Sequence, residues 1–382
     1  MKQTGQVALV HDWFLQRGGA EEVTVQILKI LQPLQPDVFA IFSSPSTMKA
    51  LDPGGASLKV HTSWLNRWPW FRKNHKILLP FFPSAMAGLK TELYPVVISS
   101  SHSAAKNLRK GPHALHICYC HTPSRYLWVW EKEYLQDYGL YRPFFFSVVQ
   151  KHLQRLRQWD KRGSQGVDFF IANSRHIAGR IKEFYGCEST VIYPPVDIDY
   201  FCPGPAEKGR DYYFTSSRDV PYKKLDMIVW AFNQMPGRRL VLATQPSAVP
   251  RLKAQAASHV EVVPMGSRHD YRAWLRGARA YVFAARDDFG IAPVEAMACG
   301  VPVLALARGG ALETVQEGVN GCFFEHQTVR SIMEGVTRFE KNFSASPQSI
   351  RSSVLRFSRD RFVQEMRAFL KERLPDALGA RL

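Results

Sequence analysis

Three carboxylates stand at a spacing that could line a ligand site. Asp287 and Asp288 follow the apolar run 281–285, and Glu295 comes after a Phe-Gly turn. The pattern predicts a strand, a loop and a short helix, with Glu295 about two turns into the helix. Asp287 and Glu295 would then face one crevice at the carboxyl end of a sheet, where open α/β sheets bind ligands. The alternative is a solvated acidic turn in which an Asp caps the helix.

The same loop offers hydrogen-bond donors. The first backbone N–H groups of a helix lack intrahelical partners and attract electron-rich oxygens. In this segment those groups belong to Phe289, Gly290 and Ile291.

Two features of the first half could also meet a ligand. Gly18 and Gly19 end an expected loop, 11–19, where a strand turns into a helix, and glycine lets backbone N–H groups approach a phosphate closely. A plain turn is the alternative. His121 ends the apolar run 115–120 before a Pro-containing loop, so its side chain could reach a ligand crevice. A structural histidine bonded to a carbonyl is the alternative there.

The elements that must position these residues form two βαβ series. Apolar runs predict strands in the first series at 7–10, 37–42, 96–99, 115–120 and 167–172. The second series has strands at 212–216, 239–243, 260–264, 280–284 and 301–306, with helices near 249–257, 270–277 and 291–299. The proline-containing stretch 193–197 separates the two series. This alternation predicts two doubly wound α/β domains that face each other across a cleft.

The two domains are expected to span 1–193 and 194–357, with a C-terminal helix in 358–382 that packs back on the first domain. That helix has an apolar stripe at Phe362, Met366, Phe369 and Leu370. In the second domain, Pro221 is expected in the first turn of the helix that carries Leu225, because proline suits that position.

Composition narrows the classes of protein. The chain has 382 residues, 46% of them apolar, which favours two globular domains. No segment is long and apolar enough to span a membrane, and the N-terminus lacks the apolar core of a signal peptide. The six cysteines include no Cys-x-x-Cys pair, so we expect reduced thiols in the cytoplasm and no zinc or disulfide framework.

The formal net charge is +17, and between Asp52 and Glu131 the only acidic side chain is Glu92. Segment 61–83 adds aromatic rings to this basic region, and its members are Trp64, Arg67, Trp68, Trp70, Phe71, Arg72, Lys73, Lys76, Phe81 and Phe82. Such a mixture suits a membrane–water interface, which we favour. A core helix with a basic outer face and a nucleic-acid strand site are the alternatives.

Several segments appear in an order typical of one enzyme family. They are Gly-Gly-Ala-Glu-Glu at 18–22, His-Thr-Pro at 121–123, Asn-Ser at 173–174, Arg-x-x-x-x-Lys at 218–223, Asp-Phe-Gly-Ile-x-Pro-Val-Glu-Ala-Met-Ala-x-Gly at 288–300 and Gly-Gly-x-x-Glu-Thr-Val at 309–315. Over nearly its whole length the chain resembles the family 4 glycosyltransferases, which have the GT-B fold of two Rossmann-like domains. Segments 79–83 and 121–128 look most like bacterial mannosyltransferases that build lipid-linked surface polysaccharides.

The resemblance implies transfer of a sugar from a nucleotide diphosphate donor, with retention at the anomeric carbon and without an essential metal or cofactor. Arg218 and Lys223 would balance the charge on the leaving diphosphate, and Lys224 could replace Lys223. Glu295 would hold the ribose hydroxyls, and His121 would lie near the reacting centre. The other implied donor-binding residues are Gly18, Gly19, Asp288, Phe289, Gly290 and Ile291.

One residue departs from the family pattern. The first carboxylate of the family's Glu-x7-Glu pair, which contacts the sugar, is here Asp287. Its side chain is one methylene shorter, so it would need a closer backbone or a bridging water, and Asp288 could act instead.

We therefore expect a retaining hexosyltransferase on the inner face of the cytoplasmic membrane. The donor would be GDP-mannose and the acceptor a polyprenyl diphosphate-linked glycan, with anionic lipids explaining the basic first half. A nucleotide-sugar epimerase or a phosphorylase of the same fold is the alternative. A nucleic-acid-binding protein is disfavoured, because it leaves the ordered motifs unexplained.

Overall fold

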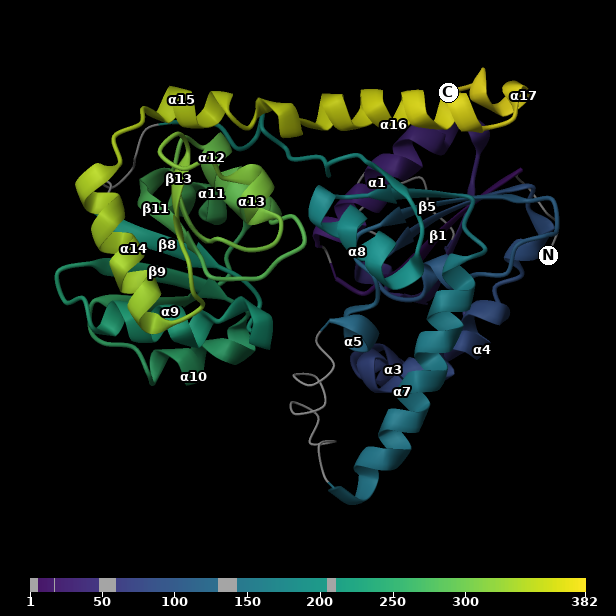
Figure 1. The fold of residues 1–382 in the computed structure, drawn as a ribbon, viewed down its shortest axis with the longest axis horizontal. Coiled ribbons are helices and arrows are strands. Elements are labelled where there is room, and N and C mark those ends of the chain that lie inside the picture. Colours follow the sequence, from purple (N-terminus) through teal and green to yellow (C-terminus); the bar gives the residue numbers. More distant parts are fainter. Residues whose placement is uncertain (1–5, 17, 48–59, 130–142, 205–210) are drawn as a thin grey trace. The chain divides into compact units, whose positions relative to one another are not determined.

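The computed structural model describes residues 6–382 except 17, 48–59, 130–142 and 205–210 (Figure 1). The chain divides into two compact units. Unit 1 comprises Met1–Tyr193 and Phe362–Leu382, and unit 2 comprises Pro194–Arg361. Each unit is built on one parallel sheet, which confirms the prediction of two doubly wound α/β units.

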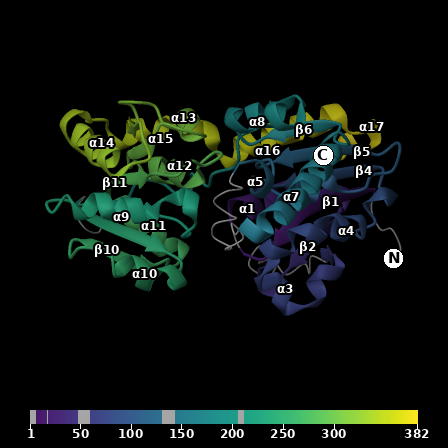
Figure 2. The ribbon, with the colours of Figure 1, turned by 60° about the horizontal axis from the view of Figure 1, so that its bottom comes forward.

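Unit 1 contains a seven-stranded sheet in the order β3-β2-β1-β4-β5-β6-β7 (Figure 2). Its strands are β1 (Val7–Phe14), β2 (Asp37–Ser43), β3 (Val60–Thr62), β4 (Val96–Ser101), β5 (Leu115–Cys120), β6 (Phe169–Ala172) and β7 (Ser189–Val191). Its helices are α1 (Gly19–Leu31), α3 (Pro69–Lys73), α4 (Phe82–Ala87), α5 (Arg125–Trp128), α7 (Pro143–Ser164), α8 (Arg175–Tyr185), α16 (Arg359–Arg373), which begins in unit 2, and α17 (Asp376–Gly379).

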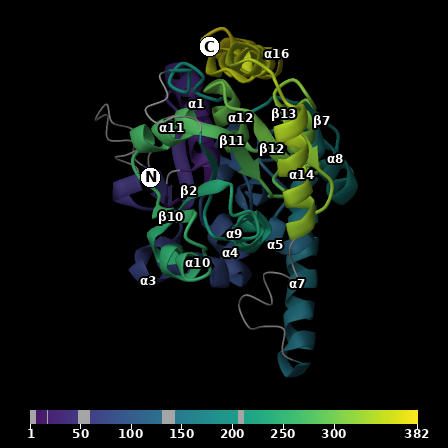
Figure 3. The same ribbon diagram turned by 90° about the vertical axis from the view of Figure 1, so that its left-hand side faces the viewer.

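Helices cover both faces of this sheet because its strands are apolar on both sides. On β1, Val7 and Leu9 pack with α1 and α16, whereas Ala8 and Val10 pack with the cluster that includes α4. The predicted apolar stripe of α16 is buried in the first of these clusters. Figure 3 shows the long helix α7 extending away from this sheet.

Unit 2 contains a six-stranded sheet in the order β10-β9-β8-β11-β12-β13. Its strands are β8 (Tyr212–Ser216), β9 (Arg239–Thr244), β10 (Val260–Pro264), β11 (Ala278–Phe283), β12 (Val303–Leu306) and β13 (Gly321–Phe324). Its helices are α9 (Leu225–Asn233), α10 (Val249–Lys253), α11 (Arg268–Gly277), α12 (Ile291–Ala298), α13 (Ala311–Thr314), α14 (Val329–Asn342) and α15 (Pro347–Ser352).

Short 3-10 helices occur in both units, at Gln32–Leu34, Trp64–Arg67, His75–Phe81, Thr91–Leu93, Ala105–Asn107, Pro221–Lys223, Pro246–Ala248 and Leu355–Phe357. Segment 61–83 is therefore a chain of short turns and helices, which corrects the alternative of one core helix there.

The strand orders locate a candidate ligand crevice in each unit. An open parallel sheet binds ligands at the carboxyl ends of the two neighbouring strands where the strand order reverses. In unit 1 those strands are β1 and β4, and in unit 2 they are β8 and β11.

Two local predictions were wrong, and both corrections concern these edges. Strand β1 continues to Phe14, so His11 lies within the strand and not in a loop. Pro221 opens the 3-10 turn Pro221–Lys223 and not α9. Lys224 then adopts a left-handed φ of 53°, which ends that turn before the helix begins at Leu225.

Candidate functional site

At the edge of unit 2, the structure joins two of the predicted site residues. The loops after β8 and β11 leave neighbouring parallel strands, and Tyr281 of β11 pairs with Phe214 of β8. The Lys223 Nζ atom donates a hydrogen bond to the Asp287 carboxylate at 2.6 Å. Both side chains are largely buried, with exposed fractions of 16% and 18%. An ion pair therefore stands at the point where the strand order of unit 2 reverses.

The acidic loop is held in place by Gly309 and Gly310. The Gly310 N–H donates to the Asp287 carbonyl at 3.0 Å. A Cβ atom on Gly310 would lie 2.4 Å from the Phe289 Cα atom, and one on Gly309 would lie 2.3 Å from the Asp287 carbonyl oxygen. Only glycine permits this approach, so the Gly-Gly motif of the sequence shapes the loop that carries Asp287.

The loop ends at Gly290, which has a φ of +84° and precedes the first residue of α12, Ile291. The sequence predicted this helix start. The Phe289 side chain is buried, and its ring packs edge-on against Phe357 at 5.3 Å. Asp288 is also buried. The buried side chains of Asp288 and Phe289 thus anchor this loop.

Glu295 is oriented by a residue that the sequence did not indicate. The Tyr271 hydroxyl donates to a Glu295 carboxylate oxygen at 3.1 Å. Burial, followed by the nearby charge of Glu295, raises the pKa of Tyr271 well above its ordinary value. The hydroxyl therefore stays protonated and acts as a donor. Glu295 itself is half-buried on α12.

The other two predicted basic residues do not join the ion pair. Arg218 is exposed, and its side chain makes no hydrogen bond or ion pair with any residue that the structure describes. Lys224 is half-buried at the start of α9. Arg218 is thus a cation at this edge that remains available to an anion.

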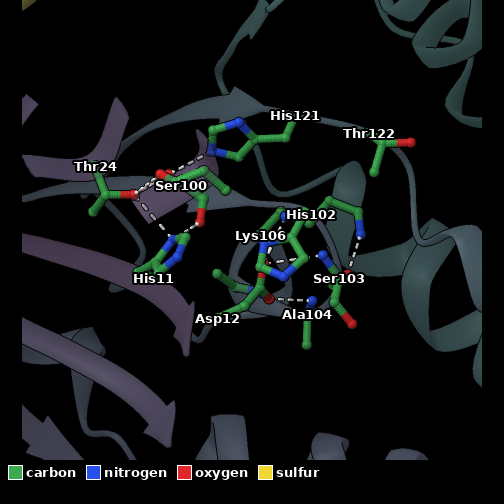
Figure 4. A network of polar contacts seen from close by, with 12 residues as sticks. His11, Asp12, Thr24, Ser100, His102, Ser103, Ala104, Lys106, His121 and Thr122 are labelled. Carbon is green, nitrogen blue, oxygen red and sulfur yellow. Dashed lines mark hydrogen bonds and ion pairs between the residues drawn. The ribbon is translucent and has the colours of Figure 1, made fainter. Parts of the chain in front are cut away.

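At the edge of unit 1, a buried carboxylate organises the loop after β4 (Figure 4). Asp12 accepts hydrogen bonds from the backbone N–H groups of His102, Ser103, Ala104 and Ala105 at 2.5–3.0 Å. The His102 Nδ1 atom lies 3.0 Å from the same carboxylate. Although burial raises the pKa of Asp12, the charge of His102 and these bonds lower it well below its ordinary value. Asp12 therefore remains ionised.

A second set of contacts links β1, α1, β4 and His121 (Figure 4). The His11 Nδ1 atom lies 2.8 Å from the Ser100 carbonyl oxygen and 3.1 Å from the Thr24 hydroxyl. The Thr24 hydroxyl contacts the Ala20 carbonyl at 2.8 Å and the Ser100 hydroxyl at 2.7 Å. The Ser100 hydroxyl in turn contacts His121 Nε2 at 2.8 Å. The predicted residue His121 therefore lies in a connected polar network.

His11 and His121 are neutral at ordinary pH. Burial, together with the charge of His102, lowers the pKa of His11 to about 4. The same two causes lower the pKa of His121 well below its usual range. The ring centroids of His11, His102 and His121 lie 5.5–6.4 Å apart. Within the part of the chain that the structure describes, the His11 Nε2 atom has no hydrogen-bond partner.

Two further features frame this edge. Gly18 and Gly19 lie at the predicted strand-to-helix turn, with Gly18 as the cap of α1 and Gly19 as its first residue. The Asn173 side chain donates to the His121 carbonyl at 2.9 Å, and Ser174 caps α8. Asn173 thus fixes the backbone of the loop that carries His121.

Behind this edge, Asp160 of α7 collects four donors. They are the side chains of Lys106, Asn107, Trp128 and Tyr185, at 2.5–2.9 Å. Burial lowers the pKa of Lys106, but the Asp160 charge outweighs it and the net pKa is raised. Through Lys106 and Trp128, Asp160 joins α7 to the loops after β4 and β5.

An exposed aromatic and basic surface, which we call the aromatic patch, occupies segment 64–81. Four large apolar side chains on it are 47–56% exposed, namely Trp68, Trp70, Ile77 and Phe81. The rings contact one another, as Trp64 does Trp68 and Phe81, with centroids 6.4 and 6.3 Å apart. Arg67 and Lys73 are exposed, whereas Trp64 and Arg72 are half-buried. The side chain of Lys76 lies outside the described residues.

Several polar residues of these two edges were not predicted from the sequence, namely Asp12, Thr24, Ser100, His102 and Tyr271. A signal existed for some of them. His11-Asp12 directly follows an apolar run, and Thr24 interrupts the apolar face of a helix. Polar side chains at otherwise buried positions require hydrogen-bond partners. Here the side chains and their partners lie together at the edge of unit 1.

Two family models match consecutive parts of the chain. The model described as Glycosyltransferase Family 4 matches residues 17–200, and the model described as Glycosyl transferases group 1 matches residues 201–352. Together the two matches span residues 17–352, so the chain is a glycosyltransferase with a family 4 part and a group 1 part.

Curated relatives of this glycosyltransferase match it over part of their length. The D-inositol 3-phosphate glycosyltransferase of Mycolicibacterium smegmatis is 28% identical over 182 residues, which cover 42% of each chain. The protein of the same name from Mycobacterium tuberculosis is 29% identical over 178 residues, which cover 41% of this chain and 37% of the relative. The matched segments span less than half of these relatives.

Solved structures match the glycosyltransferase over almost its whole length. HepE from Anabaena, in complex with UDP and glucose, has a TM-score of 0.68 at 19% identity, and the match covers 97% of this chain and 100% of HepE. The lipopolysaccharide outer core galactosyltransferase WaaB has a TM-score of 0.66 at 15% identity, with 96% and 99% covered. These similarities establish the GT-B fold.

Among the described helices of the glycosyltransferase, none is both long and apolar enough to cross a bilayer. In the same described ranges, no group of three or more His, Cys, Asp or Glu side chains could hold a metal ion. All six cysteines are free thiols.

Proposed function

We propose that this glycosyltransferase transfers a sugar, with retention, from a nucleotide diphosphate donor bound at the edge of unit 2. The observation that carries the proposal is the Lys223–Asp287 ion pair at the end of β8 and β11. A leaving diphosphate gains negative charge, and preorganised cations at that point lower the barrier. Asp287 holds the Lys223 ammonium at the edge, and the exposed Arg218 supplies a second positive group.

The rest of the donor follows from the neighbouring groups. Glu295, oriented by Tyr271, offers a carboxylate for the two ribose hydroxyls. The backbone at Gly290 and Ile291 opens α12 and offers N–H donors to sugar hydroxyls. We propose GDP-mannose as the donor, on the subfamily resemblance of segments 79–83 and 121–128. UDP-sugars are the competing outcome, since HepE was solved with UDP.

We assign the acceptor, a polyprenyl diphosphate-linked glycan, to unit 1. The edge at β1 and β4 lies where a doubly wound sheet takes its ligand, and the neighbouring strand β5 leads into His121. The aromatic patch exposes Trp and Phe rings beside Arg67 and Lys73, which suits the interface of an anionic membrane. Such a surface would bring the enzyme to a lipid-linked acceptor on the cytoplasmic face.

A thermal-shift panel of GDP, UDP and their sugars tests this proposal. A nucleotide at a hundred times its Kd stabilises the native state by about 2.7 kcal/mol. Glu295→Ala should abolish the nucleotide shift. His121→Ala should keep the nucleotide shift and lose sugar transfer to lipid-linked acceptor. No shift with any nucleotide would overturn the donor site, whereas turnover without acceptor, or phosphorolysis of a glycan, would favour an epimerase or a phosphorylase.

A further inference from the structure

We propose that Thr24 and Ser100 are positioning residues that hold His121 with its hydrogen on Nε2, so that Nδ1 offers a lone pair to a sugar hydroxyl. The part that concerns the sugar rests on the proposed function. The tautomer of His121 does not, because it follows from contacts within unit 1 alone.

The Thr24 hydroxyl has one hydrogen to give. Its oxygen lies 2.8 Å from the Ala20 carbonyl, which can only accept, so the hydrogen belongs to that contact. In the 2.7 Å contact between Thr24 and Ser100, the donor must then be the Ser100 hydroxyl.

The Ser100 hydroxyl has thereby given its only hydrogen to Thr24. Its 2.8 Å contact with His121 therefore needs the hydrogen of His121 Nε2. At the other end, His11 Nδ1 faces the Ser100 carbonyl at 2.8 Å and must donate to it. Each of these four contacts holds one hydrogen, and no other placement satisfies all of them. In the fifth contact, at 3.1 Å, the Thr24 oxygen can only accept a share of the His11 Nδ1 hydrogen, so the placement is unchanged.

The consequence for His121 is a ring with one donor turned inward and one acceptor. Its pKa lies well below the usual range because of burial and the charge of His102. His11 and the Arg125 charge lower that pKa further, and Asp12 raises it. A neutral ring with Nε2–H has a bare Nδ1, which Figure 4 shows on the side away from Ser100. A bare nitrogen accepts a hydrogen bond from a hydroxyl and cannot donate one.

The three residues come from separate elements, which explains why the arrangement is rigid. Thr24 is on α1, Ser100 on β4 and His121 at the end of β5. All three side chains are at least nine-tenths buried, with exposed fractions of 1%, 0% and 8%. Water has little access to supply a substitute donor or acceptor, so the direction of the chain of hydrogen bonds persists.

The first test measures the ring nitrogens of His121 by nitrogen-15 NMR in the ligand-free protein, with His121→Gln to assign the signals. A protonated and a bare ring nitrogen resonate far apart. We expect Nε2 protonated and Nδ1 bare in the wild type. In Thr24→Val the Ser100 hydroxyl is free to donate to Nε2, so a fraction with the hydrogen on Nδ1 should appear. Thr24→Ser keeps the hydroxyl and should restore the wild-type spectrum.

A matched control is Thr91→Val, because the Thr91 hydroxyl is also buried in unit 1 and donates to a backbone carbonyl, that of Arg109. It should leave the His121 spectrum unchanged. A wild-type signal with the hydrogen on Nδ1 would overturn the tautomer, and an unchanged spectrum in Thr24→Val would overturn the positioning role.

The second test measures sugar transfer to the lipid-linked acceptor, from the nucleotide sugar that stabilises the wild type most. Thr24→Val should show the wild-type thermal shift with this nucleotide sugar and transfer its sugar about three- to tenfold more slowly, the effect of one hydrogen bond. Wild-type transfer by Thr24→Val, or an equal loss of the thermal shift, would contradict a role at the acceptor sugar. If no nucleotide sugar binds while the NMR result holds, the proposed function fails and the positioning of His121 stands.

Discussion

Replacing Tyr271 by Phe removes the one hydroxyl that orients Glu295 from α11. The hydroxyl lies 3.1 Å from the carboxylate oxygen, and burial keeps it protonated. A hydrogen bond to a charged group contributes about 1.5–3 kcal/mol. Because Glu295 is half-buried and water can partly replace the hydroxyl, we expect a loss of about 1 kcal/mol. This corresponds to roughly fivefold weaker nucleotide binding.

Calorimetric titration with the nucleotide that gives the largest thermal shift measures this loss directly. The matched control is Tyr213→Phe, because the Tyr213 hydroxyl donates to Glu340 at 2.9 Å on another part of unit 2. The control should reduce the free energy of unfolding and leave nucleotide affinity unchanged. Wild-type affinity in Tyr271→Phe, or an equal loss in both variants, would refute the role given to Glu295 and its partner.

Three other predictions follow. Gly310→Ala would place a Cβ atom 2.4 Å from the Phe289 Cα atom. We expect it to lower the free energy of unfolding by about 1–3 kcal/mol and to weaken nucleotide binding. The control Gly179→Ala adds a Cβ in open space on α8 and should change neither quantity. Trp70→Ala should weaken sedimentation with anionic vesicles several-fold, and Trp230→Ala, also exposed, should not. Burial lowers the pKa of His116 from 6.5 to about 3. In the unfolded chain this histidine can bind a proton, so the free energy of unfolding should fall as the pH drops from about 6.5 towards 4. In urea titrations, His116→Gln should reduce that fall by about 1.4 kcal/mol per pH unit.

Regular elements were predictable because their cause is local. The bounds of β5, β8 and β10 agree with the apolar runs that predicted them, and the buried residues of α16 are the predicted stripe. Alternation of strands and helices also predicted both parallel sheets. These features depend on the period of apolar residues, which can be read directly from the sequence.

The wrong or missing predictions concern residues whose conformation and partners depend on contacts between segments distant in the sequence. β1 continues through His11 and Asp12 because four backbone N–H groups from another segment satisfy the Asp12 carboxylate, and nothing near Asp12 in the sequence announces them. The pairing of Lys223 with Asp287 depends on two strands becoming neighbours. Residue types indicated a site at each of these places, but not which atoms would meet.

We propose that the donor binds at the edge of unit 2, at the carboxyl ends of β8 and β11. A crystal structure with the nucleotide sugar that most stabilises the protein tests it directly. We predict the diphosphate on Arg218 and Lys223 and the ribose hydroxyls on Glu295. A nucleotide bound elsewhere, with these three side chains untouched, would contradict the account.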